Sequence, residues 1–183
     1  MFSKISRFIL RIWGWKLTGK YPHHVKKFVL IAMPHTSAWD IPLGFLLRSA
    51  WKGDVKYLAK DSLFKSPFGF FFYWMGGYPV DRSKRNNFVD AVVDIFNSKE
   101  RFSITIAPEG TRKKVDKLKT GFYYIAKGAN VPIVMVKFDF GKMEVGFSEP
   151  FFPSWNQEED FKFIYDYYRG SIGKNPEYGF LYD

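Results

Sequence analysis

The sequence contains no cysteine and only three histidines among its 183 residues. Without cysteine the chain forms no disulfide, holds no metal through thiolates and has no thiol nucleophile, and it is compatible with a cytosolic compartment. Acidic residues are absent before Asp40, and no apolar run reaches the ~20 residues that a membrane-spanning helix needs. Candidate nucleophiles, bases and metal ligands are therefore limited to side chains that carry oxygen or nitrogen.

Basic and aromatic residues, in contrast, are abundant. There are 28 Lys and Arg residues against 18 Asp and Glu, a net charge of +10, and aromatic residues make up 21% of the chain. A basic balance predicts an anionic partner, and nucleic acid, a phospholipid surface, a phosphorylated small molecule and an acidic carrier protein all fit. The aromatic content exceeds the needs of one core, so we expect some rings to face lipid or ligand.

Residues 1–20 are expected to form an amphipathic helix at a membrane interface. A helical step of about 100° per residue places Lys4, Arg7 and Arg11 opposite an apolar side. That apolar side consists of Phe2, Ile5, Phe8, Ile9, Ile12 and Trp13. The two arginines interrupt the apolar run, which excludes a secretory signal. The pattern favours a helix lying on anionic lipid, and the alternative is a terminal helix packed on its own domain.

Residues 21–183 are expected to form one α/β domain with a central mixed, largely parallel sheet flanked by helices, because short β-rich runs alternate with helical ones. The expected strands are 27–33, 55–59, 78–80, 102–107, 131–138 and 143–147. Helices are expected at 87–96, at 120–127 with Thr120 as its cap, and up to Arg169 after a capping box of Ser154 and Gln157. Residues 173–183 are expected to be a loosely held tail.

The segment LFKSPFGFFFYWMGGY, residues 63–78, is dense in aromatic residues and broken by Pro67 and three glycines. It is too short and too interrupted to span a bilayer. Two interpretations remain, an aromatic-walled slot for an acyl chain and a buried helix. The buried helix is favoured.

A histidine and an aspartate follow the apolar run at 27–33, in the stretch PHTSAWD. His35 and Asp40 are five positions apart, and a turn that leads into a helix near Ser37 brings the carboxylate back onto the imidazole. The carboxylate then fixes the tautomer, and the other ring nitrogen is free to take a proton as a general base. Neither a Gly-x-Ser-x-Gly motif nor cysteine is present, so the expected nucleophile is a hydroxyl of the substrate.

Two further turns end in arginine: Gly-Gly-Tyr-Pro-Val-Asp-Arg at 76–82 and Pro-Glu-Gly-Thr-Arg at 108–112. Arg82 and Arg112 offer the planar, bidentate donors that suit a phosphate monoester. Glu109 is expected to orient an arginine or to accept a hydrogen bond from a glycerol hydroxyl. Taken singly, each turn is as typical of a surface loop with salt bridges.

Taken together and in order, four blocks resemble the glycerophospholipid acyltransferase family, whose best-known members are 1-acylglycerol-3-phosphate acyltransferases. The blocks are His-x-x-x-x-Asp, Gly-x-x-x-x-Arg, Pro-Glu-Gly-Thr-Arg and Val-Pro-Ile-Val, and they extend over residues 29–138. The sequence is most similar to a short bacterial branch of that family. The resemblance implies transfer of a fatty acyl group from a thioester to a hydroxyl of a lysophosphatidate or a related lysophospholipid, in phospholipid biosynthesis.

The resemblance also implies roles for individual residues. His35 is the implied base and Asp40 its orienting partner, and Pro132 belongs to the block linked to acyl binding. The implied acceptor-phosphate site consists of Arg82, Glu109, Gly110, Thr111 and Arg112. Pro34, Pro79 and Met135 depart from the common family pattern, which leaves the acceptor and the acyl chain length open.

The expected partners follow from these assignments. The acyl donor is acyl-CoA or acyl carrier protein, and the basic loop with Lys113, Lys114, Lys117 and Lys119 suits either donor or is simply solvated. No bound cofactor, metal or nucleic acid is expected, and the protein is placed peripherally on the cytoplasmic face of the membrane. Two alternatives remain: the same chemistry on an aminolipid or other lyso-lipid, and a non-catalytic module that binds lipid or RNA.

Overall fold

The structure is a computed structural model that describes residues 2–80, 88–154 and 156–181. Its strands are β1 Lys16–Thr18, β2 Lys27–Met33, β3 Lys56–Lys60, β4 Gly77–Val80, β5 Phe102–Ile106, β6 Ile133–Asp139 and β7 Glu144–Phe147. Its helices are α1 Phe2–Ile12, α2 Asp40–Trp51, α3 Asp61–Phe64, α4 Gly69–Trp74, α5 Phe88–Ser98, α6 Gly121–Gly128 and α7 Gln157–Tyr168, with a short 3-10 helix at Pro176–Tyr178.

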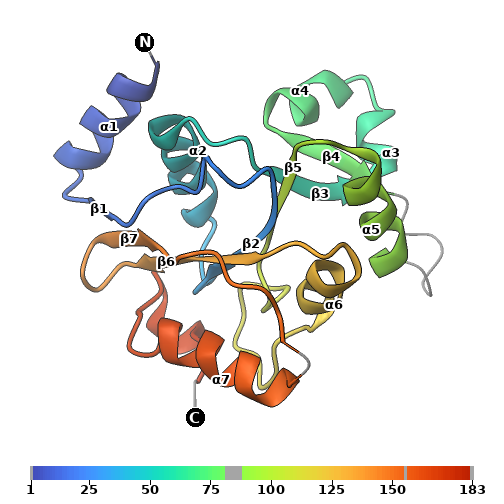
Figure 1. The fold of residues 1–183 in the computed structure, drawn as a ribbon. Helices are drawn as coiled ribbons and strands as arrows, with labels where there is room; N and C mark the ends of the chain where they lie inside the picture. Colours follow the sequence, from blue (N-terminus) through green and yellow to red (C-terminus); the bar gives the residue numbers. More distant parts are fainter. Residues whose placement is uncertain (1, 81–87, 155, 182–183) are drawn as a thin grey trace.

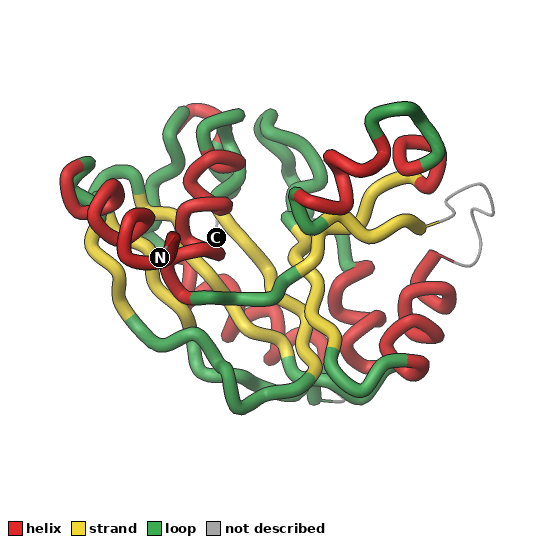
Figure 2. The backbone as a smooth tube through the Cα atoms, turned by 90° about the horizontal axis from the view of Figure 1, so that it is seen from above, coloured by secondary structure: helices red, strands yellow, loops and turns green. Residues whose placement is uncertain are grey.

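Within the described residues the strands form one seven-stranded sheet in the order β1-β7-β6-β2-β5-β3-β4. Every neighbouring pair is parallel except β6 and β7, which are antiparallel. Helices cover both faces, and the strands lie side by side through the middle of the molecule (Figures 1 and 2). The expected α/β domain with a mixed, largely parallel sheet is therefore confirmed.

Strand β2 lies at the centre of the sheet and shows how the two faces are built. Val29, Ile31 and Met33 pack into a core formed with α5, α6 and α7, whereas Phe28 and Leu30 pack into a second core formed with α1 and α2. Because successive side chains of a strand point to opposite faces, one continuous apolar run fills both cores. The central strand is thus anchored on both sides just before the residues expected to do chemistry.

Helix α1 does not pack on the domain through its apolar side. Ser3 Oγ and Arg7 Nε donate to the carbonyl oxygen of Ala50 at the end of α2, and Leu10 is buried against the same helix. The exposed fractions of Phe2 and Phe8 are 77% and 64%. Helix α1 is therefore packed on α2 while most of its apolar side stays exposed to solvent.

Three local expectations are wrong. The segment 63–78 contains the end of α3 and all of the short helix α4, with most of its rings exposed, rather than a buried helix. Asn156 caps α7 by accepting a hydrogen bond from the backbone nitrogen of Glu159, so the capping box of Ser154 and Gln157 does not form. Thr120 precedes α6 but makes no capping hydrogen bond through its side chain.

The end of the chain also differs from the expected loose tail. Phe180 is buried in the core beneath α7, and Asn175 makes two hydrogen bonds to Thr36. The segment thus returns to the turn that follows β2. The sequence of this segment offers no periodic pattern from which the contact was predictable.

Candidate active site

The residues from His35 to Asp40 connect the carboxyl end of β2 to α2. Strands β5 and β6 flank β2 in parallel, so the loop after β5 leaves the sheet at the same edge. In α/β sheets this edge, outside the carboxyl ends of the strands, is where ligands commonly bind. The topology therefore brings together the His-x-x-x-x-Asp block and the Pro-Glu-Gly-Thr-Arg block, which are far apart in sequence.

His35 and Asp40 are in direct contact. The Nδ1 atom of His35 lies 2.9 Å from Oδ2 of Asp40, and the same oxygen accepts a hydrogen bond of 3.1 Å from the backbone nitrogen of Ser37. The carboxylate side chain is 2% exposed, whereas the imidazole is 25% exposed. A proton on Nδ1 satisfies the carboxylate and leaves Nε2 as the unprotonated nitrogen. The turn expected from the sequence thus produces the geometry of an oriented base.

Asp40 is buried at the start of α2. It is the first residue of the helix, where the exposed backbone N–H groups carry partial positive charge. Among the described residues its Oδ1 has no hydrogen-bond partner although the atom is buried. The carboxylate therefore depends on His35 and the Ser37 amide for its hydrogen bonds, and loss of either partner leaves a poorly compensated buried group.

Glu109 holds the backbone of His35. Its two carboxylate oxygens lie 2.9 and 3.1 Å from the His35 nitrogen, which donates to them, and the residue is only 2% exposed. Burial raises the pKa of Glu109 to about 7, and the hydrogen bond from His35 opposes that shift. The contact of Glu109 is to the His35 backbone, and the expected contact with an arginine or a substrate hydroxyl stays a prediction. Glu109 therefore fixes the position of the His35 backbone.

The turn after Glu109 depends on glycine. Gly110 has a positive φ of 66°, and a side chain there would overlap the stem of Lys119. The backbone nitrogen of Lys119 donates to the carbonyl oxygen of Pro108 at 2.8 Å, which closes the loop. A left-handed backbone at this position favours glycine because it has no Cβ. A left-handed turn at Gly110 thus follows directly after the buried Glu109.

A third segment, near the end of the chain, holds the same loop. Thr36 is 1% exposed; its Oγ1 accepts a hydrogen bond of 3.1 Å from the Asn175 backbone, and its carbonyl oxygen accepts one of 2.9 Å from Asn175 Nδ2. Gly173 packs so closely on Thr36 that a side chain there would overlap Oγ1. Sequence reasoning missed Gly173 and Asn175. Their contact with Thr36, which is far away in the sequence, is the one feature that connects them to the site.

The remaining residues of the expected phosphate site are more open. Thr111 and Arg112 are exposed in the loop after β5, and Thr111 Oγ1 accepts a hydrogen bond from the Lys113 backbone. Among the described residues Arg112 takes part in no salt bridge. Arg82 lies outside the described residues. Arg112 therefore emerges from the same edge of the sheet as His35, with its guanidinium available to an anion.

An apolar cavity of about 430 Å³ lies between α2 and the sheet. His35 and Asp40 contribute to its lining, and the sheet contributes Leu30, Ala32 and Val136. Cavities of this size and character bind small molecules and chains, with a few polar groups to orient them. The arrangement places a proton acceptor beside a slot that suits an aliphatic chain.

Pro132 does not line this cavity. Its carbonyl oxygen accepts a hydrogen bond from the Val29 nitrogen at the amino end of β2, the opposite end of the strand from His35. The part of β6 that reaches the cavity is Val136 and Phe138. The Val-Pro-Ile-Val block itself therefore does not line the cavity, and β6 contributes to the wall through residues that follow it.

In the described part of the chain, no group of three or more His, Asp or Glu side chains is arranged to hold a metal ion. None of the described helices combines the length and hydropathy needed to cross a bilayer.

The structure is an α/β domain with a hydrogen-bonded His35–Asp40 pair at the carboxyl edge of its sheet. The sequence pattern of the family described as Acyltransferase matches residues 15–138, well over half of the 183 residues. The chain therefore belongs to the acyltransferase family, as the four sequence blocks predicted.

Named relatives agree with this family. A 1-acyl-sn-glycerol-3-phosphate acyltransferase from Saccharomyces cerevisiae is 32% identical over 129 residues, which cover 66% of this chain and 41% of the yeast protein. An Escherichia coli protein of the same name is 36% identical over 85 residues, covering 43% of this chain and 35% of its own length. The chain thus matches less than half the length of these relatives.

A solved structure has the same fold. The 1-acyl-sn-glycerophosphate (LPA) acyltransferase PlsC from Thermotoga maritima aligns with a TM-score of 0.58 and 20% identity, over 91% of this chain and 74% of that one. At this level of identity the likeness concerns the fold alone.

Proposed function

We propose that the protein is an O-acyltransferase that moves a fatty acyl group from a thioester to the free hydroxyl of a lysophosphatidate or a related lysophospholipid, at a membrane surface. The observation that carries the proposal is the hydrogen bond between His35 and Asp40 at the wall of an apolar cavity. Membership of the acyltransferase family and the names of the relatives support the same reaction.

In the proposed reaction the Nε2 atom of His35 takes the proton of the acceptor hydroxyl while its oxygen attacks the thioester carbonyl carbon. The tetrahedral intermediate then collapses, the carbon–sulfur bond breaks, and the departing thiolate receives the proton from His35. Asp40 stabilises the imidazolium that forms between the two steps. The products are the acylated lipid and a free thiol, so the base is regenerated and no group remains on the enzyme.

The apolar cavity and the loop after β5 bind different parts of the two substrates. The acyl chain of the donor lies in the apolar cavity, which excludes water from the thioester and strengthens the electrostatic contacts around His35. The acceptor phosphate binds Arg112, with Arg82 as a second partner; a guanidinium offers paired donors to a phosphate. The donor is acyl-CoA or acyl carrier protein, and no bound cofactor takes part.

The membrane mode of action also belongs to this proposal. Helix α1 presents Phe2, Ile5, Phe8 and Ile12 to solvent, beside the cations Lys4 and Arg11. An amphipathic helix of this kind lies in the headgroup layer of an anionic membrane. We therefore place the protein peripherally, on the cytoplasmic face.

The test is acyl transfer by purified protein with a labelled acyl thioester and a panel of lyso-lipid acceptors. We expect lysophosphatidate to be acylated and His35→Ala to lower the rate by about 10² to 10⁴. His24→Ala, which removes an exposed histidine, is the matched control and keeps the wild-type rate. Equal product formation by wild type and His35→Ala would contradict the proposed base.

The acceptor class is tested separately. With a phosphate-bearing acceptor, Arg112→Ala raises KM for the acceptor more than it lowers kcat, because the interaction concerns binding of the phosphate. An unchanged KM, together with acylation of an aminolipid in the panel, would assign the enzyme to the alternative acceptor class.

A further inference from the structure

A cluster of exposed aromatic side chains lies between β3 and β4. The exposed fractions of Phe68, Phe70, Phe71 and Trp74 are 69%, 72%, 45% and 78%, and Tyr73 is 55% exposed. These five side chains are called the aromatic edge below. Large rings exposed singly are ordinary, whereas a contiguous group of them marks an interaction surface.

The local packing of α3 and α4 centres on Phe64, on which Tyr73 of the aromatic edge also packs. The Phe64 ring lies 4.7 Å from that of Tyr73 and 5.9 Å from that of Phe72. A side chain at Gly69 would overlap the Phe64 carbonyl oxygen, and one at Gly77 would meet the Phe64 ring. Glycine at both positions lets the two short helices close on Phe64, while Phe68, Phe70 and Trp74 remain the most exposed rings of the aromatic edge.

The aromatic edge is connected to the candidate active site. Met75, which follows α4 directly, lines the apolar cavity, and its carbonyl oxygen accepts a hydrogen bond of 3.0 Å from Arg48 of α2. Tyr57, another cavity residue, donates to the carbonyl oxygen of Phe72 at 3.4 Å. The aromatic edge therefore adjoins the wall of the cavity that Met75 and Tyr57 form.

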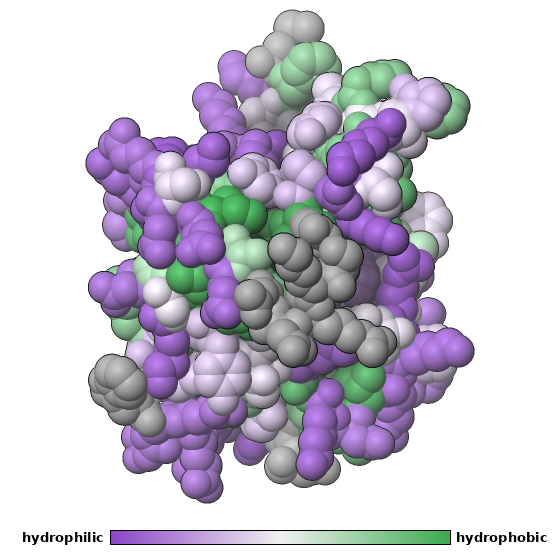
Figure 3. Space-filling model, turned by 90° about the vertical axis from the view of Figure 1, so that its right-hand side faces the viewer, coloured by the Kyte–Doolittle hydropathy of each residue, from purple (hydrophilic) through white to green (hydrophobic). Residues whose placement is uncertain are grey.

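Two apolar surfaces flank α2, the helix that covers the cavity. Figure 1 shows α1 and α4 on the upper side of the molecule with α2 between them. Figure 3 shows apolar atoms at the upper edge of the face that contains α4. The exposed apolar side of α1 and the aromatic edge are therefore placed to contact one extended surface together.

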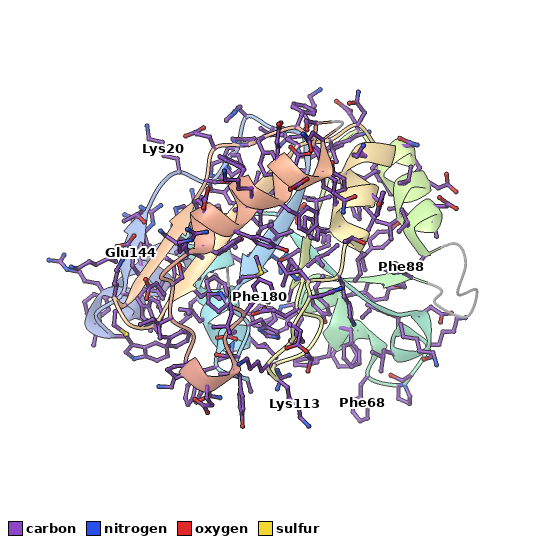
Figure 4. The ribbon with its side chains drawn as sticks, turned by 90° about the horizontal axis from the view of Figure 1, so that it is seen from below. Lys20, Phe68, Phe88, Lys113, Glu144 and Phe180 are labelled. Carbon is purple, nitrogen blue, oxygen red and sulfur yellow. The ribbon has the colours of Figure 1, made fainter. Side chains whose placement is uncertain are left out.

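Positive charge accompanies the aromatic edge. The loop after β5 exposes Arg112, Lys113, Lys114, Lys117 and Lys119, called the basic loop below, and its one exposed acidic residue is Asp116. In Figure 4 the side chains of Phe68 and Lys113 point outward at the same edge of the molecule. Aromatic rings at the depth of the headgroups with cations on anionic phosphates are the usual composition of a membrane-binding surface.

We propose that the aromatic edge and the basic loop form a second membrane-docking site, which binds an anionic bilayer together with α1. The rings insert at the boundary of headgroups and acyl chains, and the basic loop contacts anionic headgroups. Two separated contacts fix the tilt of the domain and hold the carboxyl edge of the sheet, with His35, against the leaflet. That orientation rests on the proposed function, since the acceptor lipid comes from the same leaflet. The binding of the two sites to a bilayer does not depend on the proposed function.

The experiment is co-sedimentation of the full chain with phosphatidylcholine vesicles that contain or lack phosphatidylglycerol. We expect binding to the anionic vesicles, and at least about a tenfold loss of it in Phe70→Ser/Trp74→Ser, because two large apolar side chains no longer leave water. The matched control is Phe152→Ser/Phe163→Ser, which removes two exposed rings near α7, at the opposite end of the molecule (Figure 1). This control binds as wild type does.

A second arm tests the charge. Lys113→Gln/Lys114→Gln weakens binding to the anionic vesicles by about thirtyfold and leaves the weak binding to neutral vesicles unchanged, since each of the two surface cations contributes on the order of 1 kcal/mol. Equal binding by the wild type and the aromatic-edge variant would overturn the proposal and leave α1 as the sole contact. A dimer in solution that Phe70→Ser/Trp74→Ser dissociates would also overturn it, by assigning the surface to a second copy of the chain.

This readout is independent of catalysis. If the vesicle binding depends on the aromatic edge while no acyl transfer is detected, the docking site stands and the proposed function fails. If acyl transfer is found while vesicle binding does not depend on the aromatic edge, the proposed function stands and the docking site fails.

Discussion

The turn from His35 to Asp40 and the aromatic edge lie close to the same cavity and differ in how the rest of the chain holds them. Glu109 holds the backbone of His35, and Asn175 holds Thr36, through hydrogen bonds from residues distant in sequence. The rings of the aromatic edge are largely in solvent. Rigid support suits a base that must meet a proton at a fixed position, whereas an unpartnered apolar surface suits contact with a partner that the chain does not contain.

The largest expected effect comes from breaking the support of the base at Asp40. Asp40→Asn leaves the side-chain shape but removes the negative charge that holds a proton on His35 Nδ1, so the proton-accepting nitrogen is lost. We expect kcat to fall by about 10³ to 10⁴. Steady-state kinetics on purified variants measure it, with Asp54→Asn, an exposed carboxylate, as the control. A fall of less than about tenfold would contradict the assigned role of the carboxylate.

Glu109 provides a pH test of the same support. Its pKa is raised from 4.5 to about 7, so the folded state holds a proton more tightly than the unfolded state does. The contribution of Glu109 to the free energy of unfolding is therefore fully present below pH 4.5 and is lost as the pH rises through 7. Its size over that interval is roughly 3 kcal/mol.

Glu109→Gln removes this proton equilibrium and keeps an acceptor for the His35 nitrogen. Urea unfolding at a series of pH values measures the free energy of unfolding for both proteins. The variant is expected to lack the loss of stability that wild type shows between about pH 4.5 and pH 7. A variant curve that runs parallel to that of wild type would show that Glu109 does not titrate in this range.

The fold and the His–Asp pair were predictable from the sequence because their signals are local. The apolar run at 27–33 specifies a buried strand, and His35 and Asp40 are separated by one turn, so short-range geometry decides their contact. A largely parallel sheet with helices on both faces follows from the alternation of elements along the chain, whereas the order of the strands was not predicted. Family resemblance added the roles of the residues.

Contacts between distant segments were not predictable in the same way. Glu109 bonds to a backbone nitrogen, and Asn175 bonds to a residue 139 positions away, so neither partner is marked by a side-chain pattern. The orientation of the aromatic rings also depends on Gly69 and Gly77, which close the two short helices around one phenylalanine. Density of aromatic residues predicts burial on average, and tertiary packing determined which rings stay outside.

Asn175 is expected to act as a positioning residue with a smaller effect. Asn175→Ala removes the hydrogen bond from Nδ2 to the Thr36 carbonyl oxygen, and we expect kcat to fall about 3- to 10-fold while KM for the acyl donor stays near the wild-type value. Kinetics of Glu177→Ala, an exposed neighbour, provide the control. Thr36→Ser, which keeps the oxygen that accepts from the Asn175 backbone, should retain most activity. Equal losses in kcat and in global stability for all three variants would indicate a purely structural role.

The smallest expected effect concerns the stability of the aromatic edge in solution. Trp74→Ser should change the free energy of unfolding by less than about 0.5 kcal/mol, because the side chain is 78% exposed. Phe122→Ala removes a ring that is 1% exposed and should destabilise by about 3–5 kcal/mol. Urea unfolding without vesicles compares them. A loss of similar size in both variants would mean that the aromatic edge belongs to the core after all.

The separation between chemistry and docking is tested most directly by acyl transfer in two assays, one with acceptor in anionic vesicles and one with water-soluble, short-chain substrates. We expect His35→Ala to lower the rate by about 10² to 10⁴ in both, and Phe70→Ser/Trp74→Ser to lose activity on vesicles while it keeps the wild-type rate on soluble substrates. A wild-type rate for His35→Ala in either assay, or an equal loss by the aromatic-edge variant in both, would contradict the account.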